Sequence, residues 1–505
     1  MALFVFCFAG VLAFAKTSKV GNMVYGQDML WGAGNAASVQ GGFPLKDIRA
    51  EGGILHYHYL GDVVVGLTAM AGNILPYEAE IYYFYPVVCL FMILSLYAVA
   101  KEYTGDKNKA LLFPFALLFL NGMGGNSMEI MRNMNNVATA TLFTSALLCL
   151  IFSLDKRENL RTKKSFLALV LLGVGSILTK NMYGAMVLCA ILAALAAGIL
   201  FSKKIDKWAV ISAATLAIVL LFTYIFVFNG ANNNLVLQPK NNIFTQLVGI
   251  FKQQPIGIIL FVVAGIISIR HIKSLSFSLY LVNAAAIGSV LAYLLFSHYS
   301  GSEIYFVYLA IYFFIICAMD GIDVTLKIKP VAVCMAVLAA ALMAGEVITL
   351  APVGRKGIQI AMRSLDMRPQ YPLTTQSIQS GDEEGAMYLR ENMAKGEVFA
   401  VNRTSRDMQG GDGVRHYYTA MSGRQAYVEG WRYIMDYGYD YYQLRYRLEQ
   451  VEDVIYQQDD TETAYSIARE NGIDYLLVSL PLKPKGFAGD SPVFKNDAVE
   501  IYKVK

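Results

Sequence analysis

The sequence is poor in charged residues and has no cysteine in its last 155 residues. Only 16% of the 505 residues are charged, whereas soluble domains typically have about 25%. Because 56% of the residues are hydrophobic and the mean hydropathy is +0.45, the chain is neither a soluble globule nor a disordered chain. All six cysteines lie in apolar runs before residue 335, which excludes a disulfide-bonded secreted module.

The few charges are distributed unevenly. Residues 1–350 contain 23 basic and 16 acidic side chains, a net charge of +7, whereas residues 351–505 contain 19 and 22, a net charge of −3. The chain therefore has two parts suited to different solvents, a basic transmembrane domain at 1–350 and a mildly acidic soluble domain at 351–505. The length of the second part suits one domain. Because the tail has no basic stripe, we expect no nucleic-acid partner.

Long apolar runs predict a polytopic α-helical membrane protein. A helix needs about 20 apolar residues to cross a bilayer. Seven runs meet or approach this length, and four shorter runs extend into their flanks, which predicts about eleven transmembrane helices. The first run lacks preceding basic residues and a small-residue cleavage site, so we interpret it as a helix rather than a signal peptide. The predicted spans are 2–15, 81–100, 110–121, 137–154, 165–180, 182–201, 208–228, 255–269, 275–296, 304–319 and 331–350.

Basic residues orient these spans, because cytoplasmic loops collect Lys and Arg. Fifteen of the 23 basic residues fall in alternate loops, of which 155–164 is the most basic. This pattern places the N-terminus inside and the 351–505 domain outside a plasma membrane that the chain crosses many times. The stretch 59–74 is apolar enough to span, but a span there would partly invert the charge bias. We therefore predict a re-entrant or interfacial helix there, within a large first external loop at 16–80.

The first external loop concentrates side chains that suit sugar-phosphate chemistry. Asp28 can accept a proton from a hydroxyl as a general base. Lys46, Arg49, His56 and His58 can hold a phosphate. The alternative explanation is structural, because external loops always carry polar residues and aromatic residues gather at membrane interfaces regardless of function. His-x-His spacing also suits zinc, but no third ligand is evident, so no cofactor is predicted and a divalent metal lacks support.

This layout resembles the GT-C superfamily of membrane glycosyltransferases. Its members have many helices, a large first external loop with a key acidic residue after the first span, and often a soluble C-terminal domain. The segment Asp28 … Gly42-Phe43-Pro44 … Tyr57-His58-Tyr59-Leu60 is similar to a group of prokaryotic members, and so is the tail segment 422–433. One departure is Gly32, where such proteins often have a histidine. This departure weakens the case for a metal near Asp28.

The resemblance implies an inverting transferase of the hexosyltransferase type. It would take a sugar from a polyprenyl-phosphate carrier and pass it to a saccharide, lipid or protein acceptor at the external membrane face. Asp28 would be the base or would orient the acceptor, and cations of the external loops would hold the leaving phosphate. A polar hairpin explains Arg132 equally well, and a tight external turn explains Lys180. The candidate cations are Lys46, Arg49, His56, His58, Arg132 and Lys180.

After residue 355 the apolar runs shorten to strand length and alternate with helical segments, which predicts a small α/β domain. We expect helices at 381–393 and 463–472, strands at 397–401 and 475–480, and a hairpin at the C-terminal end of the sequence. No Gly-x-Gly-x-x-Gly motif follows a strand, so nucleotide binding is not supported.

The tail also contains candidates for acceptor binding or for contact with the membrane domain. They are Arg424, Glu429, Trp431 and Arg432. Aromatic rings combined with carboxylates commonly bind sugars, and packing of tyrosines against the membrane interface is the alternative. Two other functions stay open, namely a lipid-linked saccharide flippase or transporter and a non-catalytic envelope protein. No repeat relates the two halves of the sequence, although many transporters have one.

Overall fold

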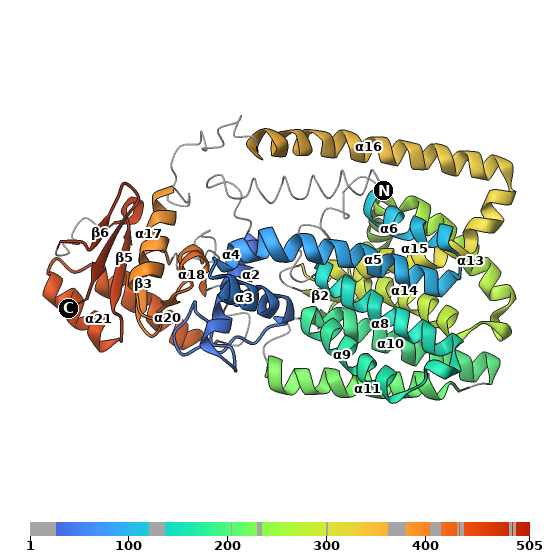
Figure 1. Cartoon of the computed structure of the whole chain (residues 1–505), viewed down its shortest axis with the longest axis horizontal. Coiled ribbons are helices and arrows are strands. Elements are labelled where there is room, and N and C mark those ends of the chain that lie inside the picture. Colours follow the sequence, from blue (N-terminus) through green and yellow to red (C-terminus); the bar gives the residue numbers. More distant parts are fainter. Residues whose placement is uncertain are drawn as a thin grey trace. The chain divides into compact units, whose positions relative to one another are not determined.

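The computed structural model of the protein forms two compact units (Figure 1). The loop–tail unit consists of Met1–Pro86, Phe228–Asn233 and Val353–Lys505, and the helical unit consists of Val87–Val227 and Asn234–Pro352. The structure describes residues 27–120, 137–203, 205–229, 235–298, 301–361, 380–404, 416–431, 434, 439–483, 487 and 491–504.

The helical unit is built from α-helices and one short antiparallel ribbon. In the ribbon, β1 (Leu235–Leu237) pairs with β2 (Phe296–His298). Two long helices, α5 and α16, also reach into the residues assigned to the loop–tail unit. The helices are α5 (Tyr85–Thr104), α6 (Lys107–Phe119), α8 (Thr139–Lys156), α9 (Lys163–Thr179), α10 (Asn181–Ala197), α11 (Lys207–Thr223), α12 (Ile243–Gln253), α13 (Pro255–Arg270), α14 (Phe277–Leu295), α15 (Ile304–Lys327) and α16 (Lys329–Ala361).

The length and composition of these helices identify an integral membrane protein. Six helices in the described part are long and apolar enough to cross a bilayer, or seven if the bent pair α12 and α13 counts as one span. The six are at Val87–Thr104, Thr139–Lys156, Asn181–Ser202, Lys207–Phe228, Phe277–Leu295 and Ile304–Lys327. The prediction of a polytopic helical membrane protein is therefore confirmed. Of the other predicted spans, α6 and α9 are shorter helices, and 2–15 lies outside the described residues.

Small residues allow these helices to approach one another closely. A Cβ added to Gly175 on α9 would lie 2.3 Å from the ring of Phe143 on α8. A Cβ added to Gly321 on α15 would lie 2.7 Å from the backbone oxygen of Leu260 on α13. Small residues at helix contacts are typical of membrane bundles, where close van der Waals packing replaces the hydrophobic effect between helices.

The first part of the loop–tail unit consists of short helical elements. They are α2 (Gln27–Ser38), the turn η1 (Val39–Gly41), α3 (Leu60–Gly72), α4 (Pro76–Glu78) and the π-helical η2 (Ala79–Phe84). The predicted helix within 59–74 is thus present as α3. Its 13 residues correspond to about 20 Å, which is shorter than the hydrocarbon core of a bilayer.

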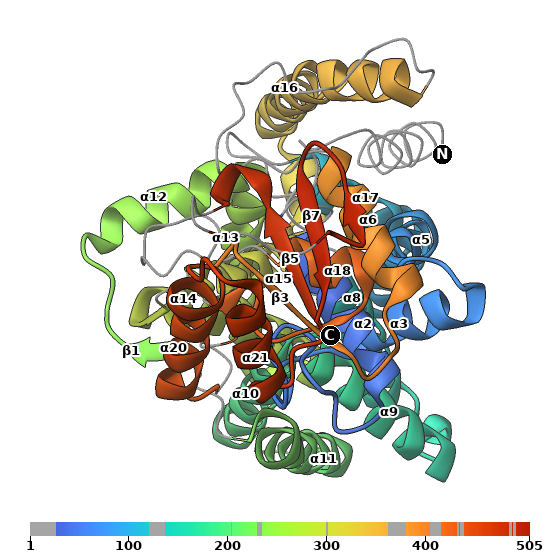
Figure 2. The ribbon, with the colours of Figure 1, turned by 90° about the vertical axis from the view of Figure 1, so that its left-hand side faces the viewer.

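The tail folds into a five-stranded mixed sheet with helices, as its alternating pattern predicts. The strand order is β4-β3-β5-β7-β6, in which β3 is parallel to β4 and β5, and β7 is antiparallel to β5 and β6. Figure 2 shows β3, β5 and β7 of this sheet. The predicted helices, strands and terminal hairpin are all confirmed. The elements are α17 (Ser380–Asn392), β3 (Val398–Val401), α18 (Tyr417–Ser422), β4 (Gln425–Ala426), α20 (Tyr441–Glu449), η9 (Gln450–Ile455), α21 (Thr461–Glu470), β5 (Tyr475–Ser479), β6 (Phe494–Lys495) and β7 (Val499–Lys503).

The first loop and the tail share one hydrophobic core. Trp31 and Tyr57 from the loop are buried with Val428 and Trp431 from the tail. The backbones also join, because Ala50 forms an antiparallel bridge with Val428. Residues 27–86 therefore belong to the same compact unit as the tail. The predicted division at residue 350 instead groups them with the transmembrane helices. That division itself stays a prediction.

Candidate functional site

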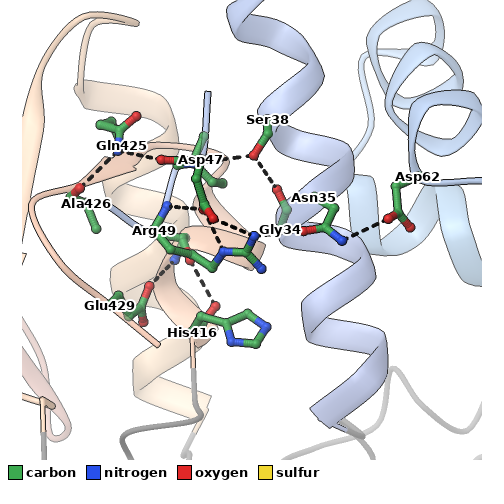
Figure 3. Close-up of polar contacts among 12 residues, drawn as sticks. Gly34, Asn35, Ser38, Asp47, Arg49, Asp62, His416, Gln425, Ala426 and Glu429 are labelled. Atoms are coloured by element: carbon green, nitrogen blue, oxygen red, sulfur yellow. Dashed lines mark hydrogen bonds and ion pairs between the residues drawn. The ribbon is translucent and has the colours of Figure 1, made fainter. Parts of the chain in front are cut away.

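A buried polar network lies where the first loop meets the tail (Figure 3). The Arg49 guanidinium is fully buried, and its Nε donates to Asp47 Oδ1 at 2.7 Å. Its Nη2 donates to Asp47 Oδ2 at 2.9 Å and to Asn35 Oδ1 at 2.8 Å. The Asn35 amide then donates to Asp62 Oδ2 at 2.8 Å. This network connects α2, the 47–49 segment and α3, so three separate stretches of the loop are held together by charge-assisted bonds.

An aromatic cluster contacts this network through Trp31. The Arg49 guanidinium lies 3.6 Å from the ring centre of Trp31 on α2. Trp31 also makes edge contacts with Tyr57 and with His416, at centroid distances of 5.7 Å and 5.5 Å. Because His416 belongs to the tail, Trp31 connects the loop network to the segment that starts α18. Such a desolvated cation–π contact stabilises more than an exposed one.

The tail contributes another buried carboxylate, Glu429. Its two oxygens accept hydrogen bonds from the backbone N–H groups of Tyr418 and Thr419, at 2.9 Å and 2.8 Å. Burial raises the pKa of Glu429 to about 7, although these hydrogen bonds partly oppose the shift. The backbone N–H of Glu429 donates to the Arg49 oxygen at 2.7 Å. Glu429 therefore joins the start of α18 to the loop segment that carries Arg49.

The predicted site residues of the first loop lie in different surroundings. Asp28 is in the first turn of α2, and its side chain lies outside the part of the chain that the structure describes. Lys46 is exposed, and His56 is half-buried. The imidazole of His58 stacks on the ring of Tyr57, with centroids 3.8 Å apart. Arg49 differs from these residues because its guanidinium is occupied by Asp47 and Asn35.

The predicted tail residues are mostly buried in the unit. Trp431 belongs to the shared core, and Glu429 lies at the junction with the loop. The Arg424 guanidinium donates to the backbone oxygens of Leu389 and Arg390, near the end of α17. Basic side chains commonly bind the last carbonyls of a helix in this way. Arg432 and Arg132 lie outside the described residues.

Lys180 belongs to the helical unit, at the break between α9 and α10. It is buried, and its Nζ lies 3.7 Å from the ring centre of Tyr305 on α15. Two further charged groups lie nearby in the same unit. Glu303 forms an ion pair with Lys240 and accepts the backbone N–H of His298 at 3.0 Å. Burial lowers the pKa of His298, Glu303 opposes this shift, and the positive charge of Lys180 adds to it.

Several residues of these clusters carry little signal in the sequence. Asn35 and His416 are separated by 381 positions and stand in segments without a recognisable motif. His416 is one of only five histidines, which is the one feature that marks it. Asp62 is marked by its position inside an apolar stretch. Across the described ranges, no group of three or more His, Cys, Asp or Glu side chains could hold a metal ion.

Comparison with solved structures identifies a related fold. The archaeal oligosaccharyltransferase AglB from Archaeoglobus fulgidus, solved with an inhibitory peptide and a dolichol-phosphate, superimposes with a TM-score of 0.50 at 10% sequence identity. The match covers 94% of this chain and 69% of that chain. A structure of the same organism's oligosaccharyltransferase tethered to an acceptor peptide covers the same shares, with a TM-score of 0.48 and 12% identity. No protein-family model and no curated protein matches the sequence.

At such low identity this likeness concerns the fold alone. The match extends over nearly the whole chain, so it includes the helical unit and the tail together with the first loop. The chain therefore has the GT-C fold, as the resemblance of its sequence implied, and that expectation is confirmed.

Proposed function

We propose that the protein is a membrane glycosyltransferase that moves a sugar from a polyprenyl-phosphate carrier to an acceptor. In this proposal the chain crosses the plasma membrane about eleven times, and the tail lies on the external side. The acceptor is a saccharide, a lipid or a protein. The GT-C fold supports this reaction class, and the related AglB structure contains a dolichol-phosphate and a peptide.

The observation that carries the proposal is the packing of α2 into the loop–tail unit. Asp28 is in the first turn of α2. Farther along the same helix, Trp31 and Asn35 bind Arg49, which is fully buried. The backbone that carries Asp28 is thus fixed to the same unit as the tail. Such rigid support from buried neighbours is what a catalytic side chain requires.

The proposed reaction is a displacement at the anomeric carbon. A hydroxyl or amide of the acceptor attacks this carbon, and the bond between the carbon and the carrier phosphate oxygen breaks, which inverts the configuration. The acceptor proton passes to the Asp28 carboxylate, and the carrier phosphate leaves with the bonding electron pair. We assign the binding of that phosphate to the external cations, among which Lys46, His56 and His58 are accessible or half-buried.

Replacement of Asp28 tests the proposal. Asp28→Asn should abolish transfer from a lipid-linked sugar donor in reconstituted vesicles, without changing the expression or the unfolding midpoint of the protein. Asp459→Asn, which alters an exposed carboxylate of the tail, is the matched control and should retain full transfer. Equal activity of both variants would contradict the role of Asp28. Substrate translocation without bond cleavage by the wild type would identify a flippase instead.

A further inference from the structure

Helix α12 makes an abrupt angle with the helix that follows it. The axes of α12 (Ile243–Gln253) and α13 (Pro255–Arg270) differ by 105°. Pro255 opens α13, where its missing N–H costs nothing, and Gln254 between the helices has a non-helical backbone. Membrane helices tilt on average by about 20° from the bilayer normal. If α13 crosses the bilayer with such a tilt, α12 lies close to the membrane plane.

Three different surfaces run along α12, because successive residues are rotated by about 100°. The first surface faces the protein, since Ile250 is buried and Gln246 accepts a hydrogen bond from the Tyr293 hydroxyl of α14 at 2.7 Å. The second surface is apolar and exposed. It consists of Ile243, Phe244, Leu247 and Phe251, with exposed fractions of 50%, 76%, 42% and 43%.

The third surface of α12 is polar. Thr245 and Lys252 lie about 20° apart on the helix wheel, and both are exposed. An exposed ammonium in the hydrocarbon core of a bilayer is costly, so this surface faces water. A helix with one protein side, one apolar side and one water side fits the boundary between lipid headgroups and acyl chains.

Helix α13 also has exposed apolar side chains. Val262, Ile266 and Ile269 on α13 are also exposed, by 53%, 52% and 70%. Aliphatic side chains at this density on a spanning helix normally contact acyl chains. Contact with acyl chains also explains why Phe244 and the other apolar side chains of α12 are exposed, without a second protein. Because both helices expose apolar side chains and α13 belongs to a candidate membrane span, we infer lipid rather than a second polypeptide as the covering partner.

We propose that α12 is an interfacial helix that docks the helical unit onto the headgroup–acyl boundary of one bilayer leaflet. The anchored leaflet is the one at the Lys180 end of the bundle. Lys240, two residues before the α12 cap at Asn242, pairs with Glu303 beside His298. The next step rests on the proposed function. In it, α12 fixes Lys180 and Lys240 at the depth where a lipid-borne phosphate lies.

Fluorescence quenching in vesicles tests the position of α12 without any assay of activity. Phe244→Trp and Lys252→Trp variants of the full chain are compared in phosphatidylcholine vesicles with and without acyl chains brominated near the headgroup. The wild type, which has three tryptophans, provides the baseline. Because an interfacial apolar face is buried by about 5–10 Å, we expect brominated lipid to remove at least about half of the fluorescence added at position 244. We expect iodide in the water to quench position 252 instead.

Two results would overturn the proposal. Quenching of position 244 by iodide as strongly as position 252 would place the apolar face in water. Protection of position 244 from both quenchers would show that protein covers it. In a separate assay, Phe244→Asp should lower transfer in vesicles by about tenfold, whereas Lys252→Asp should not. If the wild type itself transfers no sugar, the proposed function fails, while the quenching experiment still decides the position of α12.

Discussion

The Arg49 guanidinium carbon lies over Trp31, 3.6 Å from the centre of the ring. Both side chains come from the first loop. The tail also reaches this pair, because the ring of His416 makes an edge contact with Trp31. Asp47 forms an ion pair with the same guanidinium, with Nε and Oδ1 2.7 Å apart. The role that the sequence predicts for Arg49, binding a phosphate, competes with its contacts to Trp31, Asp47 and Asn35. The structure thus gives Arg49 a positioning task, and its role toward phosphate stays a prediction.

Loss of the Arg49 charge should destabilise the loop–tail unit strongly. Arg49→Met leaves the buried Asp47 carboxylate without its partner, which typically costs about 3–5 kcal/mol. The unfolding midpoint, followed by tryptophan fluorescence in detergent, measures the effect. Arg445→Met breaks the exposed pair with Glu449 and should leave the unfolding midpoint nearly unchanged. The double variant Arg49→Met with Asp47→Asn should recover part of the loss, and no recovery would refute the charge argument.

Gly430 should not tolerate a side chain. Its φ is +64°, and a Cβ would lie 2.8 Å from the Cβ of His416. Gly430→Ala should therefore cost about 2–4 kcal/mol from backbone strain and overpacking together. Gly472 is a matched control, because its φ is +69° and nothing lies within 4 Å of its added Cβ. Gly472→Ala should cost only about 1–2 kcal/mol, and equal unfolding midpoints of the two variants would exclude a steric role of His416.

Glu429 should make the stability of the protein depend on pH near neutrality. Its folded-state pKa is raised to about 7, so the folded state favours the protonated carboxyl. The stability from this group is complete below its unfolded pKa and is lost as the pH rises through 7. The loss approaches about 3 kcal/mol at high pH. Thermal unfolding from pH 5 to 9 should show this loss in the wild type but not in Glu429→Gln, and parallel curves would contradict it.

Lys180 should affect the lipid-linked donor if the proposed function holds. Lys180→Met removes a buried ammonium, and loss of a charged contact to phosphate should lower kcat/KM by at least about tenfold. Tyr305→Leu keeps the ammonium and removes the ring beneath it, so its effect should be smaller. Lys327→Met, at an exposed position at the end of α15, should have wild-type activity. A Lys180→Met enzyme with unchanged kcat/KM would remove Lys180 from the donor site.

Local patterns in the sequence predict most elements of this fold. The helices α8, α10, α11 and α14 follow from apolar runs of bilayer length, because spanning helices must be apolar along their whole extent. The strands β3 and β5 follow from short apolar runs between turn signals. The break between α12 and α13 was not predicted, and neither was the extension of α15 to Lys327. Helix ends depend on caps and on neighbours that hydropathy does not record.

Apolar length and charge content, both legible in the sequence, decide whether each segment of the chain enters lipid or water. The sequence also marks Asp28 and the polar first loop. That residues 27–86 and the tail share one core is visible in the folded chain alone. The hydrogen bond from Gln425 to the Asp47 oxygen, at 3.1 Å, joins residues 378 positions apart. Such a pairing depends on complementary shape and on the burial of Arg49, Trp31 and His416 together, and no local pattern encodes it.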